Sequence, residues 1–328
     1  MAEELLPVTE PDGQTKAVRA ELDEQTRAVL AERAAAGDRP MREASIAESR
    51  AATWGWLPYM GEPADLAKVE DRIIPSRTAE IPVRIYTPHG EGPFPALVVF
   101  HGGCWIVGNI HLSDRPHRVL AATTGCVVVA VNYQKAPEHP FPVPLEDCCA
   151  GYAWTTEHAR ELGIDPARIG VAGDSAGGNL AAAVCLRARD LGERAPAAQV
   201  LVYPALDPGL DTASARDYAE GFGLTTEDMR WSWQQYAPDE EVRLSSWVSP
   251  SRASSLEGLP PAVVVTAGFD ILRDEGLLYA ERLAACGVPT VSLHYEDSTH
   301  GFLWIGGVLE VCHRMLGDVR DALHRLWA

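Results

Sequence analysis

Short apolar runs recur along the chain from about residue 69, and segments with helical periodicity separate them. The main runs span residues 95–102, 126–133, 169–175, 197–205, 262–270 and 291–297. Most are continuously apolar and β-branched, which is typical of strands covered on both faces. Residues 308–326 instead carry one apolar stripe at helical spacing. This alternation predicts a mainly parallel α/β sheet, and the alternating, proline-ended run at 81–88 predicts an antiparallel edge strand.

Two regions interrupt this alternation. Residues 1–60 are rich in Ala and Glu and are expected to be helical, with a capping box at Ser45 and Glu48. Residues 208–248 separate two core strands and contain a helix expected to begin near Thr225. We expect these two regions to pack together as a cap over a core that is formed by residues 61–207 and 249–328.

Aromatic residues are frequent in both interrupting regions. Trp54 lies in the first, and Trp231 and Trp233 lie in the second, while Trp105 follows a glycine-rich turn of the core. These four tryptophans are candidates for substrate contact at an apolar entrance. The alternative interpretation is that they only pack the cap onto the core.

Charge and cysteine usage narrow the functional class. The chain has 328 residues and a formal charge of −18, which disfavours nucleic acid and anionic membranes as partners. No apolar run reaches about 18 residues, and the first residues lack the pattern of a signal peptide. Seven scattered cysteines without a CxxC pair indicate free thiols. We therefore expect a cytoplasmic protein.

A nucleophile motif stands out at Gly173–Gly177, which reads GDSAG. It matches G-x-S-x-G, and it follows an apolar strand and precedes a helical run, which is the context that the motif requires. Glycines flank the serine because the sharp turn brings neighbouring backbone close. Ser175 is therefore the candidate nucleophile, with the Ala176 N–H beside it.

A serine nucleophile needs a general base and an acid that orients the base. His300 lies just past the last strand, whereas His294 lies inside it and His313 lies within the last helix. Asp270 directly follows a core strand, whereas Asp274 sits where helix capping explains an acidic residue. His300 and Asp270 are the favoured partners of Ser175, and Asp274 is the alternative acid.

The turn FHGGCW at 100–105 has a cysteine where a third glycine would be expected. A free thiol is mostly neutral at pH 7, and no further ligands at suitable spacing accompany Cys104. The backbone N–H of Cys104 could donate a hydrogen bond to a charged intermediate as well as the N–H of a glycine could. We expect Cys104 at negative φ, because a left-handed conformation would cost about 1–2 kcal/mol. His101 is expected to brace the turn by hydrogen bonding to the backbone.

These motifs together resemble the hormone-sensitive-lipase family of α/β-hydrolases, also called bacterial family IV esterases. The matching stretches are HGG at 101–103, GDSAGGN at 173–179, DILRDEG at 270–276 and HGF at 300–302. Their order is that of the family, and the likeness covers roughly residues 65–328. The stretch NYQKAPEHPFP at 132–142 differs from the family pattern at Gln134 and Lys135.

The resemblance implies an eight-stranded, mostly parallel sheet flanked by helices, with a helical cap. It implies a carboxylic-ester hydrolase with the triad Ser175, Asp270 and His300 and no metal or organic cofactor. An oxyanion hole would be formed by backbone N–H groups of Ala176 and of the turn, Gly102, Gly103 and Cys104. Uncharged esters of short to medium acyl chains or aryl alcohols are the expected substrates, and a homodimer is one expected assembly.

Two other functional classes use the same residues or the same fold. An acyltransferase or an amidase would employ an identical triad, so the sequence leaves both open. A hydrolase-like small-molecule binding protein would keep the fold without the chemistry. The complete set of candidate catalytic residues favours the enzyme.

Overall fold

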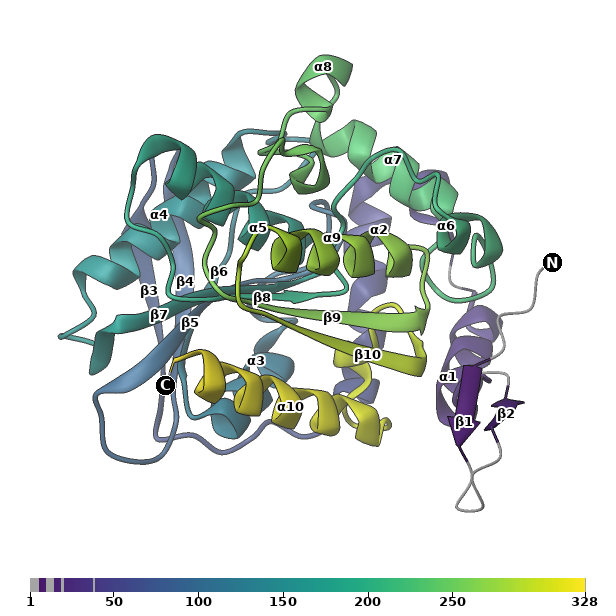
Figure 1. Cartoon of the computed structure of the whole chain (residues 1–328), viewed down its shortest axis with the longest axis horizontal. Coiled ribbons are helices and arrows are strands. Elements are labelled where there is room, and N and C mark those ends of the chain that lie inside the picture. The colour runs from purple at the N-terminus through teal and green to yellow at the C-terminus, as the bar shows by residue number, and fades with distance from the viewer. Residues whose placement is uncertain (1–5, 10–14, 19–20, 38, 328) are drawn as a thin grey trace.

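The computed structural model describes residues 6–9, 15–18, 21–37 and 39–327. Its centre is an eight-stranded sheet in the order β10-β9-β8-β7-β5-β6-β4-β3 (Figure 1). The strands are β3 Lys68–Pro75, β4 Glu80–Thr87, β5 Phe94–Phe100, β6 Val127–Val131, β7 Ile164–Asp174, β8 Gln199–Val202, β9 Ala262–Phe269 and β10 Thr290–Thr299. The pairings of β4 with β3 and with β6 are antiparallel, and the others are parallel. The predicted mainly parallel sheet is confirmed.

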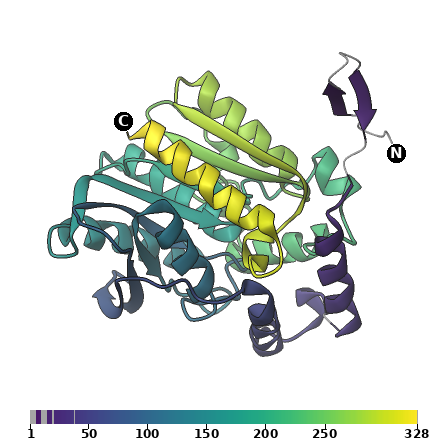
Figure 2. The same cartoon turned by 90° about the horizontal axis from the view of Figure 1, so that it is seen from below.

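Helices cover both faces of this sheet (Figures 1 and 2). The helices α4, α5 and α9 lie on one face, and α3 and α10 lie on the other. The helices are α1 Glu24–Ala35, α2 Ile46–Ala52, α3 Asp114–Thr124, α4 Val143–Glu157, α5 Ala176–Leu191, α6 Ala213–Asp217, α7 Thr226–Tyr236, α8 Glu240–Arg243, α9 Arg273–Ala285 and α10 Glu310–Leu326. Every residue of β6 and β8 is buried, as expected for strands that are covered on both sides.

The edge of the sheet differs from the sequence expectation. Strand β4 is antiparallel as predicted, but it pairs with β3 as well as with β6, so β3 is the edge strand. The sequence of β3, KVEDRIIP, has four charged residues among eight. Charged side chains suit an exposed edge but hide the apolar pattern that reveals a strand.

The N-terminal region is only partly helical. Strands β1 Leu6–Thr9 and β2 Thr15–Val18 form a separate antiparallel hairpin, so the expectation of helices throughout residues 1–60 is wrong at its start. Residues 1–5, 10–14 and 19–20 lie outside the described residues. Further along, the capping box of Ser45 and Glu48 is confirmed at the start of α2. Short 3₁₀ helices span Met41–Glu43, Thr53–Met60, Pro250–Arg252 and Phe302–Ile305.

The N-terminal region and the insertion contact each other. Helix α7 begins after Thr225, whose Oγ1 accepts a hydrogen bond from the N–H of Asp228, so the expected start is confirmed. The Asp228 carboxylate accepts a hydrogen bond from Arg42 Nη1 at 3.1 Å. A Cβ added at Gly223 would lie 3.6 Å from Leu30 of α1. The two segments that interrupt the core therefore lie side by side.

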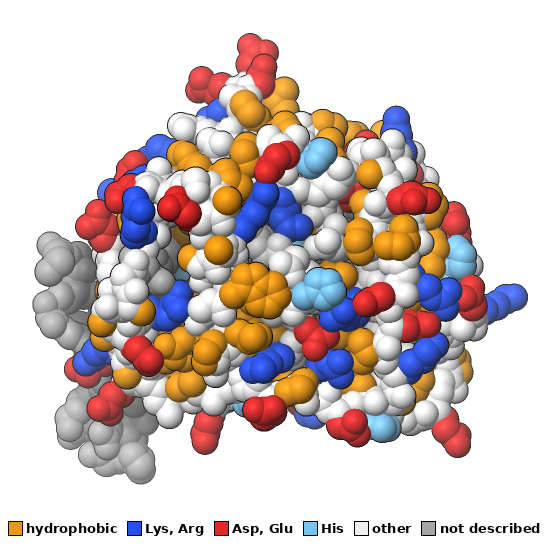
Figure 3. All heavy atoms as spheres, turned by 180° about the vertical axis from the view of Figure 1, so that it is seen from behind, with side chains coloured by type: hydrophobic (Ala, Val, Ile, Leu, Met, Phe, Trp, Pro, Cys, Tyr) orange, Lys and Arg blue, Asp and Glu red, His pale blue; other side chains and the backbone are white. Residues whose placement is uncertain are grey.

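The outer surface is mixed in character. On the face shown in Figure 3, basic side chains are scattered among acidic and hydrophobic ones. None of the described helices is both long and apolar enough to cross a bilayer.

Candidate active site

Ser175 occupies a strained turn between β7 and α5. Its backbone has φ 55° and ψ −118°, a region that non-glycine residues rarely adopt. The flanking glycines permit this turn. A Cβ at Gly173 would lie 2.2 Å from the carbonyl oxygen of Gly177, and a Cβ at Gly177 would lie 1.9 Å from the carbonyl oxygen of Phe100. The sequence therefore produces a sharp elbow that places Ser175 at the carboxyl end of the sheet.

The structure brings Ser175, His300 and Asp270 together. Ser175 Oγ donates to His300 Nε2 at 2.9 Å, and His300 Nδ1 donates to Asp270 Oδ2 at 2.7 Å. Asp270 follows β9 and His300 follows β10, so neighbouring strand ends supply both. Asp270 is buried, and its Oδ1 accepts the N–H of Leu272 at 2.9 Å. This geometry can deprotonate the serine hydroxyl and hold the imidazole in one tautomer.

The alternative residues make other contacts. Asp274 Oδ2 accepts the N–H of Ser214 at 2.8 Å, and its Oδ1 accepts from Arg273. The ring of His294 is 2.8 Å from the Thr266 hydroxyl, and the ring of His313 is 2.9 Å from the Gly306 carbonyl. None of these four contacts involves Ser175.

Three backbone N–H groups beside Ser175 have no protein acceptor among the described residues: those of Gly103, Cys104 and Ala176. The N–H of Gly102 donates instead to Asp174 Oδ1 at 2.8 Å. The expectation that Gly102 would serve the oxyanion hole is therefore wrong, because its donor is already used. Gly102 contributes by anchoring the turn.

The expected negative φ of Cys104 is also wrong. Cys104 has φ 54°, and the next residue, Trp105, has φ 61°. Burial raises the pKa of the Cys104 thiol to about 12, so this side chain is neutral near pH 7. Cys104 lines the cavity beside Ser175, and its thiol is not a reactive thiolate.

Asp174 is a site residue that sequence reasoning missed. Its carboxylate accepts the N–H of Gly102 and, through Oδ2, the indole N–H of Trp304 at 2.8 Å. Burial raises its pKa from the ordinary aspartate value. One carboxylate thus connects the glycine turn to the segment that follows His300. Its position inside the GDSAG motif was the available signal, but the motif itself assigns no partner to this residue.

His101 supports the glycine turn as expected. Its Nδ1 donates to the carbonyl of Gly102 at 2.7 Å, and its ring stacks on Tyr133 with centroids 4.4 Å apart.

The two residues that depart from the family stretch, Gln134 and Lys135, also make local contacts. Lys135 Nζ donates to the carbonyl of Tyr133 at 2.8 Å. Burial lowers the pKa of Lys135 to about 8. Gln134 donates to the buried Asp147, so both departures from the family stretch contribute to local support.

A cavity of about 670 Å³ opens beside Ser175 and His300. Its walls come from the N-terminal region, from the glycine turn and from residues 221–228. The predicted substrate-contacting tryptophans do not line it. Trp105 and Trp233 are buried in the core, Trp231 packs against a small apolar cluster, and Trp54 is exposed on the surface. Trp56 and Trp304 line the cavity instead.

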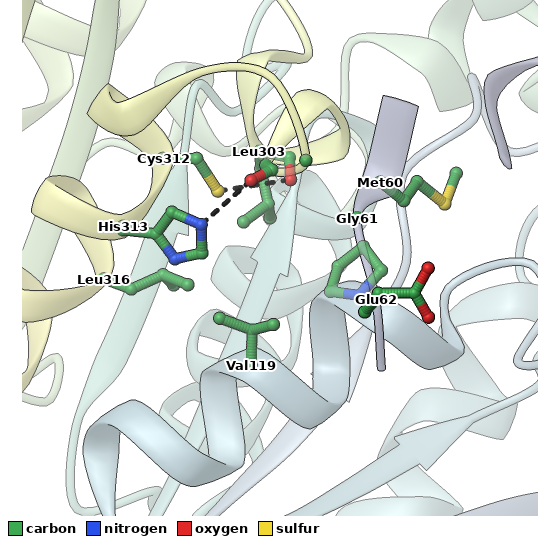
Figure 4. Close-up of a pocket in the computed structure, with 11 residues that line it drawn as sticks. Met60, Gly61, Glu62, Val119, Leu303, Cys312, His313 and Leu316 are labelled. Atoms are coloured by element: carbon green, nitrogen blue, oxygen red, sulfur yellow. Dashed lines mark hydrogen bonds between the residues drawn. The ribbon is translucent and has the colours of Figure 1, made fainter. Parts of the chain in front are cut away.

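A smaller hollow of about 260 Å³ is lined by residues of α10, of α3 and of the segment that begins at Met60 (Figure 4). Leu303 lines this hollow, whereas Trp304 and Ile305 line the cavity beside Ser175. The carbonyls of Leu303 and Gly306 accept hydrogen bonds from Cys312 Sγ at 3.5 Å and His313 Nε2 at 2.9 Å. No triad residue lines it. Within the described ranges, no group of three His, Cys, Asp or Glu side chains could hold a metal ion.

Known proteins resemble this chain in sequence. A family model described as the alpha/beta hydrolase fold matches residues 97–304. The chain is 40% identical over 292 residues to the carboxylic ester hydrolase LipN of Mycobacterium tuberculosis, covering 86% of this chain and 77% of that protein. It is 39% identical over 246 residues to an arylesterase of Saccharolobus solfataricus, covering 74% and 78%.

Solved structures of hydrolases resemble this chain in fold. An alpha/beta hydrolase enzyme from the metagenome of Lake Arreo superposes with a TM-score of 0.90 at 35% identity, covering 94% of this chain and all of that one. The hyperthermophilic esterase of Pyrobaculum calidifontis superposes with a TM-score of 0.88 at 36% identity, with 94% and 100% covered. The chain therefore belongs to the hormone-sensitive-lipase family of α/β-hydrolases, and it is a carboxylic ester hydrolase.

Proposed function

We propose that this enzyme cleaves esters through a covalent acyl-serine intermediate on Ser175. The observation that carries the proposal is the chain of two hydrogen bonds, 2.9 Å and 2.7 Å long, from Ser175 through His300 to Asp270 beside an open cavity. His300 takes the proton of the serine hydroxyl as Oγ attacks the carbonyl carbon. It then gives that proton to the leaving alcohol, and the acyl group stays on Ser175.

Water completes the cycle by the same route. His300 takes a proton from water, the resulting hydroxide attacks the acyl carbon, and the proton returns to Ser175 Oγ as the acid leaves. In both halves, negative charge collects on the carbonyl oxygen. The N–H groups of Gly103, Cys104 and Ala176 are the proposed donors to it. One such donor lowers a barrier by roughly 3–4 kcal/mol, because it meets charge that forms only in the transition state.

We propose uncharged esters of short to medium acyl chains or of aryl alcohols as substrates. The relatives support this range, since one is named an arylesterase and another, from Pseudomonas putida, an ethyl acetate hydrolase at 34% identity over 249 residues. Trp56 and Trp304 give the cavity aromatic walls. The wall also contains Asp228, whose charge is balanced by Arg42 at 3.1 Å.

The acyl-serine proposal is tested with a fluorophosphonate, which transfers phosphorus to an activated serine and releases fluoride. We expect one equivalent to react, mass spectrometry to locate it on the peptide containing Ser175, and esterase activity to fall in proportion. Modification of another residue together with loss of activity would contradict the proposed nucleophile. Persistence of activity after complete labelling of Ser175 would contradict it as well.

We further propose that Cys104 limits the acyl length that fits beside Ser175. Replacement by Gly removes the thiol from the cavity wall and also relieves about 1 kcal/mol of left-handed strain. We expect C104G to remain active and to gain about tenfold in kcat/KM for octanoate relative to acetate nitrophenyl esters. The control is C286A, which changes a cysteine at the end of α9 that does not line the cavity. Complete loss of activity in C104G, or an unchanged chain-length profile, would contradict this role.

We also propose a two-part architecture, a class of partners and a cellular compartment for the enzyme. Residues 1–60 and 208–248 would form a cap over the core of residues 61–207 and 249–328, with small-molecule esters as partners and neither nucleic acid nor membrane involved. All seven cysteines are free, which supports a reducing compartment such as the cytoplasm. The open edges at β3 and β10 are where a homodimer could pair, and light scattering of the purified protein measures this assembly.

A further inference from the structure

Two consecutive residues of the glycine turn beside Ser175 have strained backbones. Cys104 and Trp105 have φ 54° and 61°, and neither is glycine. Left-handed backbone costs about 1–2 kcal/mol for such a residue. It persists only where the surroundings hold it in place, and at functional sites the strain often serves the mechanism. The structure must therefore contain something that keeps this pair in its conformation.

The turn is held from one side by its own backbone. The N–H groups of Ile106 and Val107 both donate to the carbonyl of Gly103 at 2.9 Å, and the N–H of Ala136 donates to the carbonyl of Trp105 at 3.0 Å. These bonds fix the exit of the turn. They leave the indole of Trp105 to be positioned by other contacts.

Helix α7 supplies those contacts. The Trp105 ring is fully buried and stacks on Tyr236, with centroids 4.5 Å apart and an interplanar angle of 1°. Trp233, one turn earlier on the same helix, lies 4.4 Å from the Trp105 ring at 47°. Cys104 contacts Ser232 of this helix through its thiol. One face of α7 therefore contacts both strained residues.

Ring contact, rather than hydrogen bonding, holds this cluster together. Among the described residues, Trp105 Nε1, Trp233 Nε1 and Tyr236 Oη have no hydrogen-bond partner, although all three are buried. A buried donor without an acceptor costs roughly 1–3 kcal/mol. The aromatic cluster therefore carries the energetic cost of three unpaired polar groups, and it lies where the catalytic turn needs support.

We propose that Tyr236 and Trp233 are positioning residues for catalysis. By clamping the indole of Trp105, they keep the Gly103 and Cys104 N–H groups directed at the oxygen of the substrate carbonyl. This inference rests on the proposed oxyanion hole. The inference also gives the insertion a role in catalysis. Without its contacts to α7, the strained backbone of the turn would relax, and the Gly103 and Cys104 N–H groups would no longer point at the substrate oxygen.

The test compares Tyr236→Leu, which loses the flat ring, with Tyr236→Phe, which loses only the unpartnered hydroxyl. For Y236L we expect kcat per active site to fall about 10- to 100-fold with KM changed less than about threefold, since displaced donors act only in the transition state. For Y236F we expect kcat within about threefold of the parent. Active sites are counted by fluorophosphonate titration, so that unfolded protein does not enter kcat.

A second readout separates positioning from stability. Ser175 Oγ adds to the carbonyl carbon of an aryl trifluoromethyl ketone, His300 takes the proton, and the resulting oxyanion occupies the proposed hole. We expect the inhibition constant of this ketone to rise in Y236L by the same factor as kcat falls. A merely structural role would lower the titrated fraction of active enzyme and leave both quantities unchanged.

The outcomes are distinguishable. Parent-like kcat and ketone affinity in Y236L would overturn the inference, and so would an equal loss in Y236F, which would assign the effect to the hydroxyl. If Y236L does not fold, Tyr236→Met gives the same comparison with a longer apolar chain. Ser175→Ala is measured alongside: activity in that variant would refute the proposed function itself, whereas its inactivity beside an unaffected Y236L would refute only the clamp.

Discussion

Ser175→Ala should reduce esterase turnover at least about ten-thousand-fold while leaving the fold intact. The substitution removes only the side-chain hydroxyl, and its oxygen, Oγ, is the atom that would form the bond to the acyl group. Its loss leaves His300 without a proton to accept, because Ser175 Oγ is 2.9 Å from His300 Nε2. The donors of the turn stay in place, so binding of ester should persist and any residual rate should come from water in the cavity.

The measurement is hydrolysis of nitrophenyl acetate, together with circular dichroism and thermal unfolding to verify the fold. Alanine accepts the φ of 55° about as poorly as serine, so the melting temperature should change little. Ser255→Ala, on an exposed serine that does not line the cavity, is the matched control and should keep full activity. Turnover by S175A above about 1% of the parent would exclude Ser175 as the nucleophile.

Much of the core could be predicted because burial on both faces leaves a clear trace in sequence. The residues of β6 are five consecutive apolar positions, and all are buried. Strand β3 left no such trace, since an edge strand exposes one side and carries charge to resist pairing with other chains. The hairpin of β1 and β2 was missed for a related reason, because four-residue strands are too short to show a period.

The grouping of the candidate triad could be predicted because each residue directly follows a core strand. Strand ends of a parallel sheet meet at one edge, so Ser175, Asp270 and His300 had to lie near one another. The partner of each polar group was harder to predict. Nothing local indicates that the Gly102 N–H donates to Asp174, a residue 72 positions away in the chain.

Side-chain exposure of the aromatics depended on packing between distant segments. Trp105 and Trp233 were predicted as substrate contacts because one lies in the glycine turn and the other in the insertion, yet their rings pack together with centroids 4.4 Å apart and both are buried. The predicted negative φ of Cys104 was wrong in the same region of the structure. A local argument assigns the cheaper conformation to Cys104, whereas we propose that the stacking of Trp105 on α7 holds the costlier one.

Asp270→Asn is the second variant with a large expected effect, and it isolates the role of the acid. The Asp270 carboxylate is buried and accepts the Nδ1–H of His300 at 2.7 Å. An asparagine in the same place can turn its NH₂ group toward Nδ1, which favours the tautomer that carries its proton on Nε2. That nitrogen can then no longer accept the proton of Ser175. We expect kcat to fall about ten-thousand-fold at pH 7 with KM little changed.

Asp274→Asn provides the matched comparison, since Asp274 is only four residues away and was the other candidate acid. Its carboxylate accepts from Ser214 and Arg273 and makes no contact with His300. D274N should therefore keep kcat within about threefold, even if its melting temperature falls through the weakened link to Ser214. A large loss in D274N beside normal turnover in D270N would reverse the assignment. Equal, small losses in both would mean that His300 keeps its working tautomer without a carboxylate, and the proposed orienting role of Asp270 would have to be abandoned.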